Sequence, residues 1–302
     1  MRGRSELGGL AFVALASLQF GTIDVLARVV GRSGVSILPF LAARFALTGT
    51  LLLGILLLSR TPVRIPWRDR GRLLALGAGG NAVQSGLFFF AVRQSGAAVV
   101  TLIFFIYPVW VVLLALVLGE HAPTRLVGGA MLLSVVGTTL IFASEHGAQL
   151  TALGAALALG SSVAYASYLV AARRLVGGTT PLTATFWTSV GASGGLGAVS
   201  LMAGTWSWPV ARDPLGLVAA TGALGAFAFL CLLVGLSRAD VVGASLVSST
   251  EALAATVLAV AFLRESLTPT AVLGGAMLLV GAAIAVVARG RGGASARRAQ
   301  PG

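Results

Sequence analysis

The sequence predicts an all-α integral membrane protein with ten transmembrane helices, arranged as a 5+5 inverted-topology repeat. Hydrophobic residues make up 57% of the 302 residues and charged residues only 10%, whereas a soluble domain carries roughly a quarter charged residues. Apolar runs of about 20 residues, the length needed to cross a bilayer as a helix, recur from one end of the chain to the other. A segment that occurs twice predicts the duplication.

Ten apolar runs reach the length of a membrane span. The breaks between them carry helix-ending sequences such as Arg60-Thr61-Pro62 and Asp213-Pro214, because proline is tolerated in the first turn of a helix, where its missing N–H has no partner. We expect spans at about 8–29, 36–59, 72–92, 97–118, 124–143, 150–172, 182–203, 215–236, 241–263 and 268–288.

The distribution of arginine predicts the orientation. All 21 basic residues are Arg. If the N-terminus is cytoplasmic, 15 of them fall in inside segments and five in outside segments. Because basic residues accumulate on the cytoplasmic side, we expect a multi-pass protein of the cytoplasmic membrane with both termini inside. The positive charge then reflects contact with the lipid bilayer, and a nucleic-acid partner is not expected.

An internal repeat is visible in the sequence. The residues Gly128-Gly129-Ala130-Met131-Leu132-Leu133 recur as Gly274-Gly275-Ala276-Met277-Leu278-Leu279. Leu-rich spans resemble one another by composition, but a six-residue identity with matching flanks favours duplication. We expect a first five-helix repeat over 1–148, a second over 149–288, and a disordered basic cytoplasmic tail over 289–302.

An odd number of spans in each copy places the two copies in opposite orientations. Inverted repeats recur among transporters, with the substrate site near the membrane midplane at the interface of the repeats. Such symmetry suits alternating access, in which one unit rocks against the other and opens either side in turn.

With these features the chain resembles the drug/metabolite transporter superfamily, in particular its ten-span EamA branch. Beside the repeated segment, the resemblance is carried by Tyr107-Pro108-Val109, Gly119-Glu120, Leu263-Arg264-Glu265 and Ala43-Arg44-Phe45. It implies ten spans, a 5+5 inverted repeat and the movement of small metabolites. The chain departs from the family pattern at Phe20-Gly21, where Trp-Gly is common, and at Glu251-Ala252, where Glu-Pro is common. Both departures lie near the expected pathway and leave the substrate open.

Three charged residues lie well inside the predicted spans, where each charge costs at least about 2.5–3.5 kcal/mol. Asp24 and Arg44 lie at similar depth in neighbouring spans. They suit either a structural ion pair or a site for the amine and carboxylate of a zwitterion, and in a third alternative Asp24 reaches the outer lipid headgroups. Glu251 lies near the midplane with no basic neighbour in sequence. Because burial there disfavours the carboxylate, it is a candidate to bind a proton or substrate, and a hydrogen-bonded structural role is the alternative.

Uncharged polar residues complete the candidate pathway. Tyr107 has the repeat-equivalent depth of Glu251, and Pro108 predicts a helix kink because it removes a backbone hydrogen bond. Both suit either the pathway or packing, and the other polar side chains could instead bridge helices. The substrate-pathway candidates are Glu251, Tyr107, Arg44, Asp24, Asn81, Gln84, Gln19 and Tyr165.

The residue inventory argues against other classes of protein. The two His residues, His121 and His146, lie in short loops, and the chain contains no Lys for a nucleotide-binding P-loop. We therefore expect no enzyme activity, no metal site and no cofactor. We expect a secondary transporter of a small polar or amphipathic metabolite, with an amino acid or derivative favoured and protons as a candidate coupling ion. The alternative is a flippase or carrier of lipid-linked or drug-like cargo, or a non-transporting membrane scaffold. A homodimer stays open.

Overall fold

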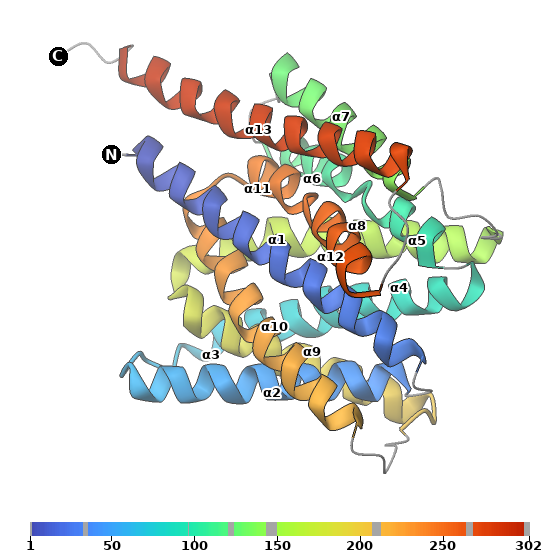
Figure 1. The fold of residues 1–302 in the computed structure, drawn as a ribbon. Coiled ribbons are helices and arrows are strands. Elements are labelled where there is room, and N and C mark those ends of the chain that lie inside the picture. The colour runs from blue at the N-terminus through green and yellow to red at the C-terminus, as the bar shows by residue number, and fades with distance from the viewer. Residues whose placement is uncertain are drawn as a thin grey trace.

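The computed structural model describes the backbone of residues 2–32, 36–95, 97–119, 124–142, 150–206, 213–263 and 268–298. Within these residues every regular element is a helix (Figure 1). The start of α1 (Arg2–Arg32) and the end of α13 (Pro269–Arg298) both lie on the left of Figure 1, on the same side of the bundle.

Helices lie at all ten predicted spans. The first half forms α1 (Arg2–Arg32), α2 (Ile37–Leu58), α3 (Trp67–Leu76), the π-helix η1 (Gly77–Ala82), α4 (Val83–Gln94), α5 (Ala97–Phe104), α6 (Tyr107–Val117) and α7 (Arg125–Phe142). The second half forms α8 (Ala152–Leu175), the short 3-10 helix η2 (Val176–Gly178), α9 (Pro181–Met202), α10 (Asp213–Arg238), α11 (Val241–Ser248), α12 (Glu251–Leu263) and α13 (Pro269–Arg298).

The helices confirm the membrane class. In the described part of the chain, eight spans are long and apolar enough to cross a membrane, and α7 is a shorter apolar helix. The helix α9 has 22 residues but buries several hydroxyl groups. The hydroxyl groups of Thr185 and Thr188 donate to backbone carbonyls one turn earlier, at 2.7 and 2.9 Å. These hydrogen bonds lower the cost of burying the two hydroxyl groups in apolar surroundings.

The helices α7 and α13, which carry the repeated Gly-Gly-Ala segment, pack closely and run antiparallel. Gly137 lies against Gly274, and Ala130 lies against Gly281. The residue numbers of these contacts fall along α7 as they rise along α13, as expected for two antiparallel helices. The missing side chains let the two backbones approach. Helices with a shared sequence that run in opposite directions have the relation that an inverted repeat requires.

Each half of the chain packs its first helix into the other half. The helix α1 packs on α10 and α12, and α8 packs on α4, α5 and α6. Gly9 of α1 lies against Gly235 of α10, and Tyr168 of α8 lies against Gly80 of η1. The interface between the halves is therefore built twice from corresponding helices, and it holds the largest cluster of buried side chains.

The fourth span of each half is interrupted at the same place. The helix α5 ends at Phe104 and α6 begins at Tyr107, whereas α11 ends at Ser248 and α12 begins at Glu251. The same 144 residues separate the two helix ends and the two helix starts. Both spans are thus broken near their middle, and Tyr107 and Glu251 occupy matching positions at the start of the second segment.

The break in span four differs from the expected kink at Pro108. Pro108 lies in the first turn of α6 and cannot donate to the Phe104 carbonyl one turn earlier. Ser162 of α8 replaces that donor, with its Oγ donating to the Phe104 oxygen at 2.9 Å. At the matching place in α12 the Ala252 N–H donates to the Ser249 carbonyl at 3.2 Å. The second break therefore forms without a proline.

We expect Ser162→Ala to lower the thermal stability of the protein. The Phe104 carbonyl would lose its donor in apolar surroundings, at a cost of about 1–3 kcal/mol. The matched control is Ser167→Ala in the same helix, because the exposed Ser167 hydroxyl bonds only to Val163 of its own turn. Thermal unfolding in detergent measures the difference, and equal melting temperatures for the two variants would contradict the role of Ser162.

The expected disordered tail differs from the structure. The helix α13 continues to Arg298, and residues 299–302 lie outside the described part of the chain. Ala and Arg are good helix formers. Here they extend a helix that has already passed its costly nucleation step, so the helix continues past the end of the apolar run.

Candidate functional site

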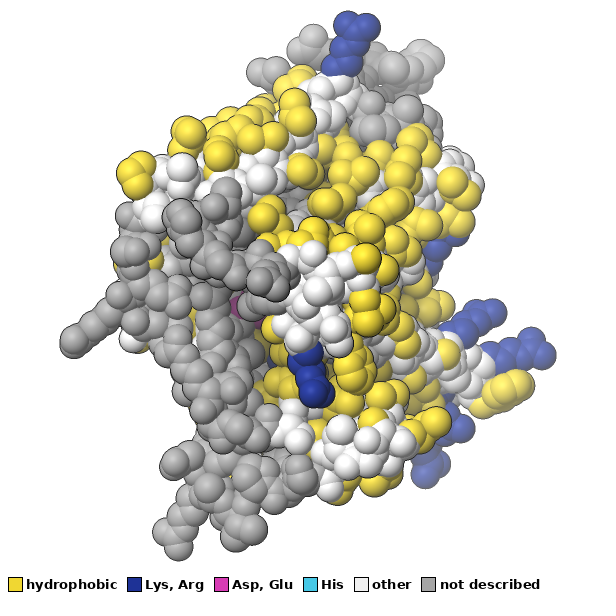
Figure 2. Space-filling view, turned by 90° about the vertical axis from the view of Figure 1, so that its right-hand side faces the viewer, with side chains coloured by type: hydrophobic (Ala, Val, Ile, Leu, Met, Phe, Trp, Pro, Cys, Tyr) yellow, Lys and Arg dark blue, Asp and Glu magenta, His cyan; other side chains and the backbone are white. Residues whose placement is uncertain are grey.

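A cavity of about 640 Å³ lies between the two halves, within the size range of about 300–1,000 Å³ typical of small-molecule sites. It reaches the end of the bundle at which α2 begins and α4 ends, because Ser36 and Arg93 belong to its lining. We call this end the mouth. Figure 2 looks onto the side of the molecule that carries it and shows an acidic side chain inside a hollow, with a basic side chain beside it.

The cavity brings together the three charged residues that the sequence places inside the spans. Asp24 comes from α1, Arg44 from α2 and Glu251 from the first turn of α12. Asp24 and Glu251 line the same cavity, within electrostatic range of each other. The guanidinium group of Arg44 lies within electrostatic range of both carboxyl groups. The central carbon of this group, Cζ, lies 5.0 Å from the centre of the Phe45 ring. Both signs of charge therefore line one cavity.

Close packing of α1 on α12 holds the two carboxyl groups together. Gly21 lies one turn before Asp24, and a Cβ atom there would come 2.7 Å from the Ala255 nitrogen and 3.0 Å from the Glu251 carbonyl oxygen. Real Cβ atoms essentially never come that close to backbone atoms. Glycine at this position thus sets the distance between the helix of Asp24 and the helix of Glu251.

Uncharged polar side chains also line the cavity. Asn81, Gln84 and Tyr165 belong to the cavity lining. Asn81 belongs to η1, and π-helical turns often occur at functional sites. The Gln84 amide donates to the Ser161 hydroxyl at 3.3 Å, and that hydroxyl donates to the Gln84 carbonyl at 3.0 Å. These contacts fix α4 against α8, and the Ser85 hydroxyl donates to the Gln84 side-chain oxygen at 3.2 Å.

The cavity lining is also rich in aromatic side chains, which the sequence did not predict. Phe20 packs edge-on against Phe229 with ring centres 4.9 Å apart. The phenylalanines in the lining are Phe20, Phe45, Phe88, Phe89, Phe104, Phe105 and Phe229. The pairs Phe88-Phe89 and Phe104-Phe105 are visible in the sequence, but aromatic residues in a span face lipid or the protein core equally well.

Two predicted pathway residues lie behind the cavity wall and are not among its described lining residues. Tyr107 is fully buried, its hydroxyl donates to the Ser245 carbonyl at 3.1 Å, and its ring packs edge-on against Tyr165 at 4.8 Å. Gln19 is buried, and its side-chain amide donates to the Leu15 carbonyl at 2.9 Å. Both therefore make structural contacts in this conformation.

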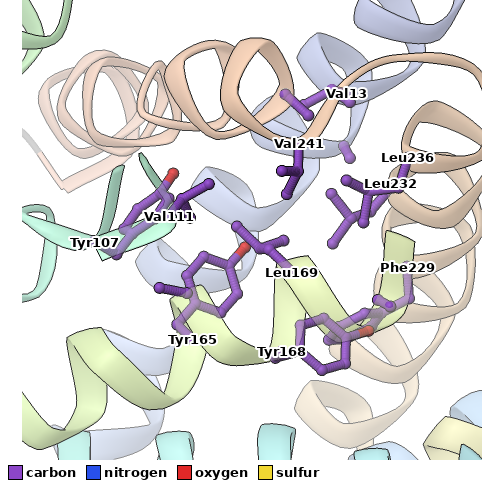
Figure 3. Close-up of a cluster of buried hydrophobic side chains, with 14 of the residues drawn as sticks. Val13, Tyr107, Val111, Tyr165, Tyr168, Leu169, Phe229, Leu232, Leu236 and Val241 are labelled. Carbon is purple, nitrogen blue, oxygen red and sulfur yellow. The ribbon is translucent and has the colours of Figure 1, made fainter. Parts of the chain in front are cut away.

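A cluster of buried side chains is drawn in Figure 3. We call it the tyrosine cluster, and its members are Val13, Tyr107, Val111, Tyr165, Tyr168, Leu169, Leu232, Leu236 and Val241. On α1 its member Val13 lies farther from the mouth than Asp24, because α1 runs towards the end at which α2 begins. Tyr165 belongs to both features, because it lines the cavity and packs against Tyr107 and Tyr168. The cavity is thus open at the mouth and closed on the other side.

Broken helices around a central cavity with charged groups, placed between two repeated halves, are the architecture of membrane transporters. Comparison with known proteins identifies the family. The model of the EamA-like transporter family matches residues 7–143 and, a second time, residues 152–287. The chain belongs to the EamA-like transporter family and is a membrane transporter of that family.

Two further proteins are similar along nearly the whole chain. An uncharacterized transporter of Archaeoglobus fulgidus is 27% identical over 289 residues, which is 92% of this chain and 96% of that protein. A protein of known crystal structure has the same fold, with a TM-score of 0.81 and 22% identity, over 96% of this chain and 99% of that chain.

Proposed function

We propose that this transporter is a secondary transporter that moves a small polar or amphipathic metabolite across the cytoplasmic membrane by alternating access, coupled to protons. The observation that carries the proposal is the cavity in which Asp24, Arg44 and Glu251 meet between the two halves. Buried charges in membrane proteins are costly and mark substrate and ion pathways. Transport driven by an ion gradient also fits a chain without a nucleotide-binding P-loop.

The composition of the cavity favours an amino acid or a derivative as cargo. Arg44 can pair with a carboxylate, since guanidinium groups form strong charge-assisted hydrogen bonds with carboxylates. Asp24 and Glu251 can accept hydrogen bonds from an ammonium group. The phenylalanine wall supplies an apolar surface for a side chain. These groups match the three parts of an amphipathic zwitterion.

The matching breaks in the two halves suggest how access alternates. Thr101 of α5 lines the open cavity, and Ser245 of α11 lies 144 residues later, beside the tyrosine cluster. We propose that in the second state the tyrosine cluster opens and the present mouth closes. Ser245 would then line the open cavity, as Thr101 does in the present state. With both termini in the cytoplasm, the present mouth faces outward.

Paired cysteine variants test alternating access and orientation together. We expect Thr101→Cys to react with a membrane-impermeant maleimide added outside, and Ser245→Cys to react with the reagent added inside. The background is Cys231→Ala, which removes the native thiol. Ser59→Cys, in the exposed turn after α2, is the control for access from inside. Labelling of Thr101→Cys and Ser245→Cys from the same side would contradict alternating access.

The transport activity itself is tested by tracer flux in proteoliposomes. We expect uptake from a mixture of radiolabelled amino acids to exceed uptake by protein-free liposomes, and to increase when a pH gradient is imposed. Tracer uptake that stays the same with and without the pH gradient would contradict proton coupling. No flux for any amino acid would contradict the proposed cargo and favour the alternative of a lipid-linked or drug-like cargo.

A further inference from the structure

The backbone hydrogen bonds at the two helix breaks match each other. In the first half the Phe105 N–H donates to the Thr101 carbonyl at 3.0 Å, and in the second half the Ser249 N–H donates to the Ser245 carbonyl at 3.2 Å. Donors and acceptors are both 144 residues apart in the two halves. The N–H groups one residue further on also bond alike, Ile106 to Ile103 at 3.3 Å and Thr250 to Val247 at 3.0 Å. A side-chain contact at one break therefore predicts a contact at the other.

One side-chain contact joins the two halves at the second break, on the side of the cavity away from the mouth. The Tyr107 hydroxyl, from α6 of the first half, donates to the Ser245 carbonyl of α11 at 3.1 Å. Tyr107 is fully buried. A phenol keeps its proton at physiological pH, so Tyr107 donates whatever the pH on either side of the membrane. We call this contact the inner gate.

The second state proposed above exchanges the roles of the two halves, and this exchange moves the contact to the mouth. Glu251 lies 144 residues after Tyr107, and Thr101 lies 144 residues before Ser245. The counterpart of the inner gate is therefore a contact from Glu251 of α12 to the Thr101 carbonyl of α5. Both residues line the open cavity in the present state. Glutamate is shorter than tyrosine, and the small Ala252 beside it in the lining leaves room for α5 to come closer.

We propose that Glu251 closes the mouth by donating a hydrogen bond to the Thr101 carbonyl, and that it does so only after taking up a proton. This inference rests on the proposed function, because it names the contact through which the coupling proton acts. A carboxylate and a carbonyl oxygen both only accept hydrogen bonds, and burying the unpaired carboxylate against Thr101 is costly. The protonated carboxyl supplies the missing O–H, and it keeps acceptor capacity for the ammonium group of a substrate. We call this contact the outer gate.

The titratable groups around Glu251 come from several helices. The lining that it shares holds Asp24 of α1, Arg44 of α2, Arg93 of α4 and Tyr165 of α8, and Tyr107 packs behind Tyr165. The helix α7 also packs on α12, and Arg125 lies in its first turn. These groups influence the pH at which Glu251 takes up its proton. Glu251 alone occupies the position that matches Tyr107.

The proton gives the outer gate a direction. Closing the mouth takes up one proton, so a lower pH favours the closed mouth, by up to about tenfold in the ratio of closed to open molecules for each pH unit. With the mouth facing outward, the proton comes from water outside. After the inner gate opens, the O–H bond of Glu251 breaks and the proton leaves to water inside. An acidic exterior therefore drives the transporter towards its inward-open state.

Distances between spin labels test the outer gate without substrate and without a gradient. The outer pair, Gln94→Cys with Phe262→Cys, lies at the mouth ends of α4 and α12. The inner pair, Leu118→Cys with Arg238→Cys, occupies the matching positions 144 residues away. All four side chains are exposed, and the background is Cys231→Ala. We expect a lower pH to shorten the outer distance and lengthen the inner one. An outer distance that does not respond to pH would overturn the proposal.

Two neutral replacements of similar length isolate the hydrogen-bond donor. Glu251→Gln carries an amide that donates at every pH, whereas Glu251→Met has no donor. We expect the outer pair to stay close in Glu251→Gln and to stay apart in Glu251→Met, in both cases without a response to pH. Equal outer distances in the two variants, or a pH response in Glu251→Met like that of the unchanged protein, would show the outer gate to be wrong.

Tyr107→Phe tests the inner gate, from which the outer gate is inferred. Phenylalanine keeps the ring and removes only the O–H donor. We expect the ratio of open to closed molecules at the inner pair to rise by about 2- to 10-fold at every pH, as for the loss of a typical neutral hydrogen bond. An unchanged inner distance would mean that the contact with Ser245 closes nothing, and the outer gate would lose its basis.

The two proposals fail separately. If the spin-label distances respond to pH as expected but no tracer crosses the liposomes, the outer gate stands and the proposed transport of amino acids fails. If tracer uptake responds to the pH gradient but the outer distance does not respond to pH, proton-coupled transport stands and the outer gate is wrong.

Discussion

Glu251→Gln is expected to reduce gradient-driven uptake to the level of protein-free liposomes. Glutamine has nearly the same volume as glutamate, but it cannot take up or release a proton in this pH range. The ammonium group of the substrate also loses one charged acceptor. A hydrogen bond to a charged group contributes about 1.5–3 kcal/mol, so we expect substrate affinity to fall by about 10- to 150-fold.

The measurement is tracer uptake into proteoliposomes at several imposed pH gradients. Asp69→Asn is the control, because it removes a carboxylate from the exposed start of α3 and leaves the cavity unchanged. We expect wild-type uptake and wild-type pH dependence for this variant. If Glu251→Gln showed the same uptake and the same pH dependence as the wild type, the role of Glu251 in coupling would be wrong.

Gly191→Ala is expected to give a large loss of stability for a change of one methyl group. Gly191 lies where α9 crosses α3, and a Cβ atom there would overlap the Leu74 carbonyl group. Neither backbone can move without disturbing its own helix, and such overpacking typically costs about 1–3 kcal/mol, occasionally more. The melting temperature in detergent should fall by several degrees.

Gly194→Ala in the same helix is the matched control, because a Cβ atom there meets no other atom within 4 Å. Alanine favours a helix over glycine by about 1 kcal/mol, so this variant should melt at the same temperature as the wild type or slightly higher. If both variants had the same melting temperature, close backbone contact would not explain the glycine at position 191.

The fold was largely predictable because the signals that determine it are local. Each span needs a long apolar run, and the ten runs of the sequence coincide with helices in the structure. The charged members of the cavity were also predictable, because Asp24, Arg44 and Glu251 each carry a cost in the membrane that an isolated position would not tolerate.

The parts that were not predictable depend on how each helix is rotated. A span that is apolar all round has no polar face to indicate which side chains point inward, so the sequence could not place Tyr107 behind Tyr165 or assign the phenylalanines to the cavity wall. The π-helix at Gly77–Ala82 depends on backbone geometry that no residue pattern reveals. The break before Glu251 lacks the proline that would have indicated it, since Ala252 occupies that position.

The exchange of first helices between the halves has a consequence for biosynthesis. The helix α1 enters the membrane early, yet its partners α10 and α12 belong to the eighth and ninth of the ten spans. Glu251 follows Asp24 by 227 residues, which corresponds to roughly 10–45 s at translation rates of about 5–20 residues per second. During that interval the Asp24 carboxyl lacks its eventual neighbour. Until the second half is synthesised, the surface of α1 that later packs on α10 and α12 is uncovered. We expect the insertion machinery or a chaperone to shield this surface during that interval.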